Sequence, residues 1–203
     1  MINATTIAKF ALSVMTDRIE GSSLGELSIR SRTLKVFCAS VEAKRDLLIS
    51  LDNKEYAYSR IKGSMNVDLR KWHDLGPHLC SKNVLSLAKQ FDTNADFSQL
   101  KNGARAKTIF GKDKILQLEH VLPVDQIISL ILQTEEGSCL ESLIAETSCT
   151  AWILQEEDHL VKGRSYRASP RESYCLAGVN LMTKRGDHWD DFDWTPIESW
   201  VSR

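Results

Sequence analysis

Residues 114–133 read KILQLEHVLPVDQIISLILQ and hold the two patterns that decide the fold. The first part, residues 114–121, is short and largely apolar, which predicts a strand. The second part, residues 124–133, has apolar residues at helical spacing and follows Pro123, a residue that is common where helices begin. A strand followed at once by a helix predicts a small sheet with helices packed against it.

The rest of the C-terminal half alternates in the same way. Residues 139–146 predict a helix, and residues 150–154 predict a short strand that leads into an acidic helix start. The segment beginning at Ser169 has the form of a capped helix start, and Gly178 is placed to end that helix before a strand over residues 179–182.

The first hundred residues predict helices instead. Apolar residues recur at helical spacing in four stretches, which are residues 5–19, 33–51, 67–75 and 83–91. Residues 92–104 are polar and contain Asp, Asn and Gly, which marks a boundary or a surface loop.

The fold class that follows is α+β (mixed α/β), with a helical N-terminal half and a small sheet with flanking helices in the C-terminal half. At 203 residues the chain is long enough for one sizeable domain. We expect a single domain over residues 1–203. If it divides further, the expected parts are a helical subdomain over residues 1–100 and an α/β subdomain over residues 105–203.

The charges of the chain nearly cancel. It has 26 Lys and Arg against 27 Asp and Glu, a formal net charge of −1. No overall field therefore draws it toward nucleic acid, and any contact with DNA has to come from local basic patches. The residues that we expect to hold DNA phosphates are Lys107, Lys112, Arg164 and Arg167.

The cysteines and the apolar runs indicate the compartment. The five cysteines are irregularly spaced without a Cys-x-x-Cys pair, and no secretory leader opens the chain. The longest strongly apolar run, residues 121–132, is interrupted by polar residues and is shorter than the ~20 residues that span a bilayer. We expect a cytoplasmic protein with reduced thiols and no membrane partner.

Glu119 and His120 at the end of the predicted strand are the sharpest chemical candidates. A carboxylate can bind a hard divalent cation such as Mg²⁺ or Mn²⁺, while an imidazole deprotonates water for attack on a phosphodiester. Neighbouring strand residues point to opposite faces, so a shared site requires that this rule relaxes where the strand ends before Pro123. The alternative is a structural pair that hydrogen-bonds to the backbone.

The pattern Glu119-His120-x-x-Pro123 resembles the first half of the metal motif of HNH (His-Me finger) nucleases. The resemblance implies that His120 is the general base and Glu119 a metal ligand. The second half of the motif is not found, because no asparagine occurs between residues 103 and 179. His159 is the nearby substitute for the missing ligand.

The acidic run Glu156-Glu157-Asp158 supplies further carboxylates. A strand, a helix and a second strand can bring both strand ends to one edge, so Glu157 and His159 are expected to join Glu119 as metal ligands. The alternative is that the acids only stabilise the start of a helix.

Two other metal or nuclease patterns are weaker. Asp113 and Glu119 have the spacing of two acids in a restriction-like nuclease, but Val121 stands where such a core has a lysine. His73, His78 and Cys80 could supply three ligands to zinc. The alternative is that the histidines are ordinary surface residues at the end of a helix.

Two functions are therefore predicted. The first is a metal-dependent endonuclease that cleaves DNA phosphodiesters in a phage, plasmid or restriction system. The second is a non-catalytic interaction or regulatory protein that binds a protein partner through the acidic, aromatic tail, residues 187–203. Trp189, Phe192, Trp194 and Trp200 would be the anchors of that interface.

Overall fold

The computed structural model describes residues 23–53, 55–74, 78–91, 96–100, 115–134, 140–161, 163 and 166–202. The predicted helix over residues 5–19 lies outside these residues. Lys107, Lys112, Asp113 and Arg164 also lie outside them.

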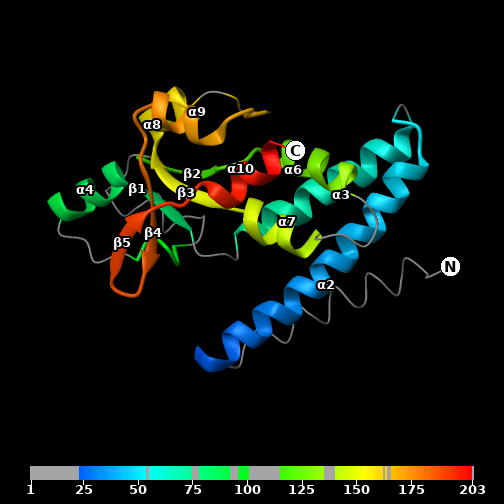
Figure 1. Ribbon diagram of the computed structural model, residues 1–203, viewed down its shortest axis with the longest axis horizontal. Coiled ribbons are helices and arrows are strands. Elements are labelled where there is room, and N and C mark those ends of the chain that lie inside the picture. The colour runs from blue at the N-terminus through cyan, green and yellow to red at the C-terminus, as the bar shows by residue number, and fades with distance from the viewer. Residues whose placement is uncertain are drawn as a thin grey trace.

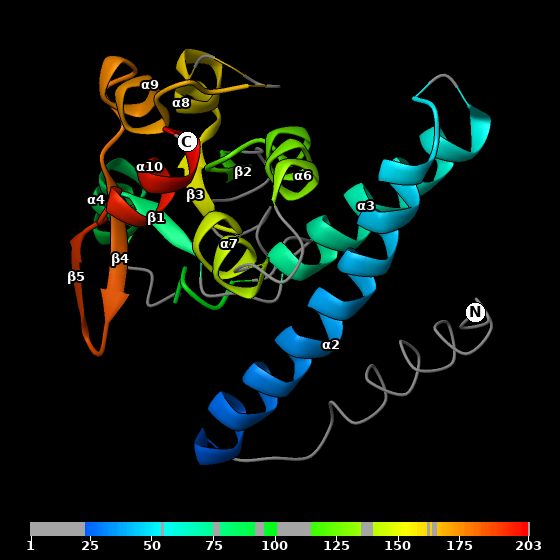
Figure 2. The same cartoon turned by 45° about the vertical axis from the view of Figure 1, so that its right-hand side comes forward.

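The described strands form one mixed sheet in the order β2-β3-β1-β4-β5 (Figure 1). The strands are β1 (Leu79–Ser81), β2 (Leu116–His120), β3 (Thr150–Leu154), β4 (Leu181–Arg185) and β5 (His188–Asp191). β3 and β1 pair in parallel, and the other neighbours pair antiparallel. The hairpin of β4 and β5 lies at the outer edge of the sheet (Figure 2).

Helices cover both faces of the sheet, and others pack together beside it. They are α2 (Ser23–Ser50), α3 (Tyr56–His73), α4 (Lys82–Gln90), α6 (Val124–Gln133), α7 (Leu140–Thr147), α8 (Gln155–Leu160), α9 (Pro170–Leu176) and α10 (Thr195–Val201). Residues of α4 pack on one face with Phe97, while residues of α9 and α10 pack on the other. The fold is α+β, with a helical N-terminal half and a sheet with flanking helices in the C-terminal half, which confirms the predicted class.

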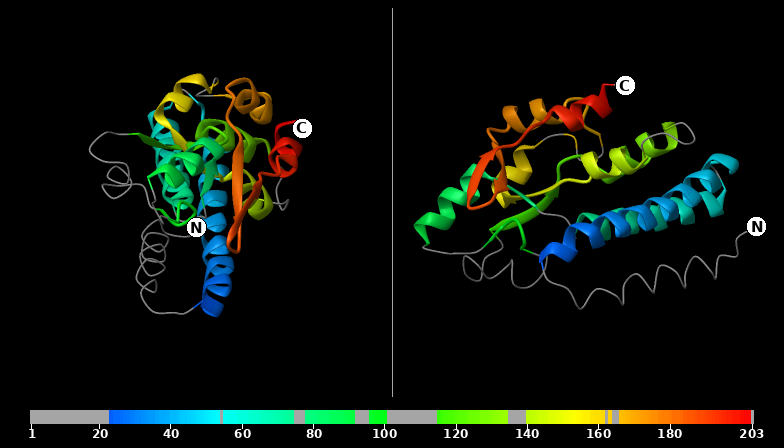
Figure 3. Two further views of the ribbon diagram at one scale, coloured as in Figure 1. Left: turned by 90° about the vertical axis from the view of Figure 1, so that its left-hand side faces the viewer. Right: turned by 60° about the horizontal axis from the view of Figure 1, so that its bottom comes forward.

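A third apolar core joins the N-terminal helices to the C-terminal half. Met65 and Leu69 of α3 share this core with Ile127 of α6, Leu143 of α7 and Trp200 of α10. The long hairpin of α2 and α3 runs beside α6 and α7 (Figure 3). In addition, β1 and α4 come from the first hundred residues and belong to the sheet region.

The elements around the quoted stretch match their predicted bounds most closely. Helix α6 and strand β3 have the predicted limits, and β2 lies inside its predicted range. Strand β1 was not predicted, because three residues are too few for a period to show. The strand predicted over residues 179–182 is β4, which begins at Leu181. The N–H of Val179 donates to the carbonyl of Tyr174 at the end of α9, so this residue is bonded to the helix and not to the sheet.

The tail forms part of the folded body. Residues 188–191 are β5 and residues 195–201 are α10. Trp200 is 6% exposed in the third core, and its indole Nε1 donates to Glu146 Oε2 at 2.6 Å. Trp200 is therefore engaged inside the molecule, where it cannot also anchor a partner. No helix among the described residues has both the length and the apolar character needed to cross a membrane.

We expect Trp200→Ala to lower the free energy of unfolding by about 3–5 kcal/mol, because it empties a buried aromatic site and leaves Glu146 without its donor. Urea unfolding followed by circular dichroism measures this. Ser199→Ala, at an exposed position of the same helix, should change stability by less than about 0.5 kcal/mol. A stable chain that lacks residues 187–203 would contradict the core role of the tail.

Candidate functional site

Glu119 and His120 are the last two residues of β2, and both remain paired with β3. Glu119 lies opposite Ala151, and His120 lies opposite Thr150. Because pairing continues to the end of the strand, the two side chains project to opposite faces of the sheet. The structure therefore does not bring Glu119 and His120 into one site.

Arg167 holds the Glu119 side of the strand end. One of its guanidinium nitrogens, Nη1, donates to the carbonyls of His120 and Val121 at 2.6 and 2.8 Å. The other, Nη2, donates to Glu119 Oε1 at 2.5 Å. The Arg167 side chain is 1% exposed, against 19% for Glu119. Arg167 thus contacts the protein interior and positions Glu119, instead of facing a phosphate as the sequence predicted.

The backbone of Arg167 is fixed as firmly as its side chain. Its N–H donates to Gln126 Oε1 at 2.8 Å, and Gln126 Nε2 donates back to its carbonyl at 2.9 Å. Its guanidinium also lies over the ring of the buried Tyr174, 5.3 Å from the centroid. These contacts pin the segment before α9 against α6 and β2.

A second carboxyl group, that of Asp158, acts on Glu119 through its charge and a side-chain hydrogen bond. Burial raises the pKa of Glu119, the Arg167 guanidinium opposes this, and the hydrogen bond and negative charge of Asp158 raise it again. A negative charge beside a carboxyl group disfavours its ionised form, whereas a bound cation favours that form. The pair Glu119 and Asp158 is called the carboxyl pair below.

Glu157 does not join this pair. Its side chain is buried and accepts hydrogen bonds from Ser81 Oγ, Asn83 Nδ2 and the backbone N–H of Leu154, at 2.7–2.8 Å. Glu157 therefore holds the start of α8 to the end of β1. For Glu157, the alternative that the acids only stabilise the start of a helix is therefore the one that the contacts support.

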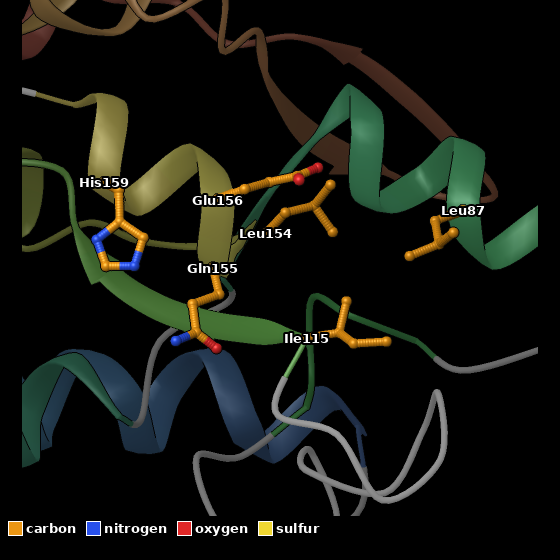
Figure 4. Close-up of a pocket in the computed structure, with 6 residues that line it drawn as sticks. All are labelled: Leu87, Ile115, Leu154, Gln155, Glu156 and His159. Carbon is orange, nitrogen blue, oxygen red and sulfur yellow. The ribbon is translucent and has the colours of Figure 1, made fainter.

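His159 faces a different region. Its exposed side chain lines a pocket of about 460 Å³ (Figure 4), and the other lining residues are Leu87, Ile115, Leu154, Gln155 and Glu156. The predicted ligand set of Glu119, Glu157 and His159 is not brought together. Within the described ranges, no group of three or more His, Cys, Asp or Glu is placed to hold a metal ion.

The other face of the strand end carries a pair of histidines. The ring of His120 lies 4.8 Å from that of His73, centroid to centroid, with an interplanar angle of 52°. His73 is 1% exposed, and neither of its ring nitrogens has a hydrogen-bond partner among the described residues. Burial, with nearby positive charge, lowers the pKa of His120 to about 4 and that of His73 well below its ordinary value. Both rings are neutral at pH 7.

The predicted zinc set of His73, His78 and Cys80 is divided between separate contacts. His78 Nδ1 is hydrogen-bonded to Thr150 Oγ1 at 2.6 Å, and Cys80 lies in the apolar core under α4. Burial raises the pKa of the Cys80 thiol, which disfavours the thiolate that would bind zinc.

Asp158 is the functional candidate that the sequence did not single out. The acidic run was noted, but successive helical residues point about 100° apart, so only one of three acids can face β2. Which one does so depends on the phase of α8, and Glu157 sets that phase through its bonds to β1 and α4.

No protein-family model, no curated protein and no solved structure matches this chain. What the protein does is therefore inferred from its own residues.

We expect Arg167→Met to lower the free energy of unfolding by about 3–5 kcal/mol, because it leaves Glu119 and two buried carbonyls without their donor. Urea unfolding at pH 7 measures this. Arg171→Met, at an exposed position on α9, is the matched control and should cost less than about 0.5 kcal/mol. A loss under 1 kcal/mol for Arg167→Met would mean that the guanidinium contacts contribute little.

His120 should make the protein less stable in acid. Between pH 6.5 and about 4 the unfolded chain binds a proton at His120 that the folded chain does not, so stability falls as the pH falls through this window. In His120→Gln the fall should be shallower by as much as ~1.4 kcal/mol per pH unit. Urea unfolding at several pH values checks this, and parallel curves for the two proteins would contradict it.

Proposed function

We propose that this protein is a metal-dependent endonuclease that cleaves DNA phosphodiesters, with Glu119 and Asp158 as the carboxylates that bind Mg²⁺ or Mn²⁺. The observation that carries the proposal is the carboxyl pair, which joins the end of β2 to α8. The proposal keeps Glu119 from the predicted ligand set and replaces Glu157 with its neighbour Asp158.

The donor set fits a hard cation. Mg²⁺ prefers oxygen ligands and is commonly bound by one or two carboxylates, with waters and substrate phosphates completing the octahedron. Glu119 and Asp158 are both partly exposed, so water and a phosphate can reach them.

The residues divide the remaining work. Arg167 fixes the orientation of Glu119 through Oε1 and is a positioning residue. His120 is given no part as general base, because its ring faces His73 on the other face of the sheet. When bound, the ion supplies charge neutralisation at the phosphate and a water of lowered pKa. Lys107, Lys112 and Arg164 remain the proposed phosphate contacts.

We further propose that the protein acts in the cytoplasm. The cysteines of the described residues, Cys38, Cys80, Cys149 and Cys175, are free thiols. Free thiols are typical of reducing compartments.

Incubation with supercoiled plasmid DNA and Mg²⁺ or Mn²⁺ tests the proposal. Wild type should nick or linearise the plasmid, EDTA should stop it, and Glu119→Gln and Asp158→Asn should each lower the rate by about 100-fold or more. Glu156→Gln is the matched control, because this acid lies on the same helix and lines the pocket instead. No cleavage by wild type, or equal cleavage by the Glu119 and Asp158 variants, would refute the proposal.

A non-catalytic binding protein is the second candidate, and the outer strand of the sheet favours it. β5 pairs only with β4 within the described part of the chain, and Asp187, Asp191 and Asp193 are exposed on or beside it. An edge strand can pair with another chain, and these acids favour a basic one. If this candidate is right, wild type cleaves no plasmid, and charge reversal at Asp187 and Asp191 weakens partner binding while circular dichroism shows the fold unchanged.

A further inference from the structure

The histidine pair on the other face of β2 has unmet bonding capacity. A buried imidazole normally satisfies at least one nitrogen, and a buried polar group without a partner calls for an explanation such as an ion or a water. Both nitrogens of His73 lack a partner among the described residues, whereas the buried His78 is bonded to Thr150. Of these two buried histidines, His73 is therefore the one whose ring nitrogens call for an explanation.

The ring of His120 lies beside that of His73 and could share a ligand with it. Only part of the His120 side chain is buried, and its ring faces that of His73 at a tilt. We propose that His73 and His120 together bind one borderline divalent transition-metal ion of the Zn²⁺, Co²⁺ or Ni²⁺ class.

The geometry suits such an ion. Two imidazole nitrogens that each lie about 2.1 Å from one Zn²⁺ at a tetrahedral angle are about 3.4 Å apart. Rings whose centroids are 4.8 Å apart at 52° can turn a nitrogen each toward that point. His73 is the interior ligand, and the ion enters past the part-exposed His120.

The chemistry of the donors selects the class of ion. Neutral imidazole nitrogen suits Zn²⁺, Co²⁺, Ni²⁺ and Cu²⁺, whereas Mg²⁺ prefers oxygen. Two protein ligands leave the remaining positions to water. Arg70, whose Nε donates to Asn66 Oδ1, is the positive charge that acts on both rings. It opposes a cation, so binding should be weaker than at a site with three histidines.

The site is independent of the proposed nuclease centre. Glu119 and Asp158 lie on the opposite face of the sheet and offer oxygen. Loss of Glu119 should remove Mg²⁺-dependent cleavage and leave the transition-metal site unchanged, so failure of one proposal is distinguishable from failure of the other.

Titration of the full-length protein with Zn²⁺ by calorimetry, and with Co²⁺ by visible absorption, tests the inference. Cys175 is exposed and could bind metal by itself, so every protein in the series carries Cys175→Ser. The parent should bind one ion, and His73→Gln and His120→Gln should each weaken binding by about tenfold or more, at least the cost of losing a second-shell partner. His188→Ala and His159→Ala are matched controls at exposed positions and should bind like the parent.

The outcome is decided even when the buried position does not tolerate change. If His73→Gln fails to fold by circular dichroism, His120→Gln at the part-exposed position decides the question. Equal affinity of the parent and folded His120→Gln overturns the inference, as does the absence of any Zn²⁺ binding by the parent. A tenfold or larger loss in His120→Gln, with Glu119→Gln binding like the parent, supports it.

Discussion

The buried guanidinium of Arg167 is the interaction on which the rest of this architecture depends. It donates to the carbonyl of His120, the last residue of β2, and to that of Val121, in the link between β2 and α6. Carbonyls at such a junction have no ladder partner, and leaving them buried without a donor costs free energy. One side chain therefore closes the strand end, orients Glu119 and, through Gln126, fixes the segment that enters α9.

The charge balance around Arg167 follows from this placement. A buried arginine requires a nearby anion, and Glu119 supplies it. Asp158 adds a second carboxyl group, whose negative charge acts on Glu119. The proposed metal site is built on these two acids.

The sequence predicts the parts of this site that are local. The bounds of α6 and β3 follow from periodicity and from Pro123, and the place of Glu119 near the end of a strand follows from the pattern of residues 114–121. The roles of Arg167 and Asp158 do not follow, because each acts on Glu119 from far along the chain: Asp158 is 39 positions away (158 − 119) and Arg167 is 48 positions away. A basic residue in a basic run predicts a surface patch, and only tertiary packing turns Arg167 inward.

The alternation of β2 explains why adjacent residues of one motif have different surroundings. Ala151, opposite Glu119, is small and leaves room on that face for the buried ring of Tyr174 and for Arg167. Thr150, opposite His120, has its hydroxyl bonded to His78 on the other face. Since the register with β3 holds to the last residue, the acid and the imidazole cannot meet without unpairing the strand. This register permits the two proposed sites, one with oxygen ligands and one with nitrogen ligands, only on opposite faces of the sheet.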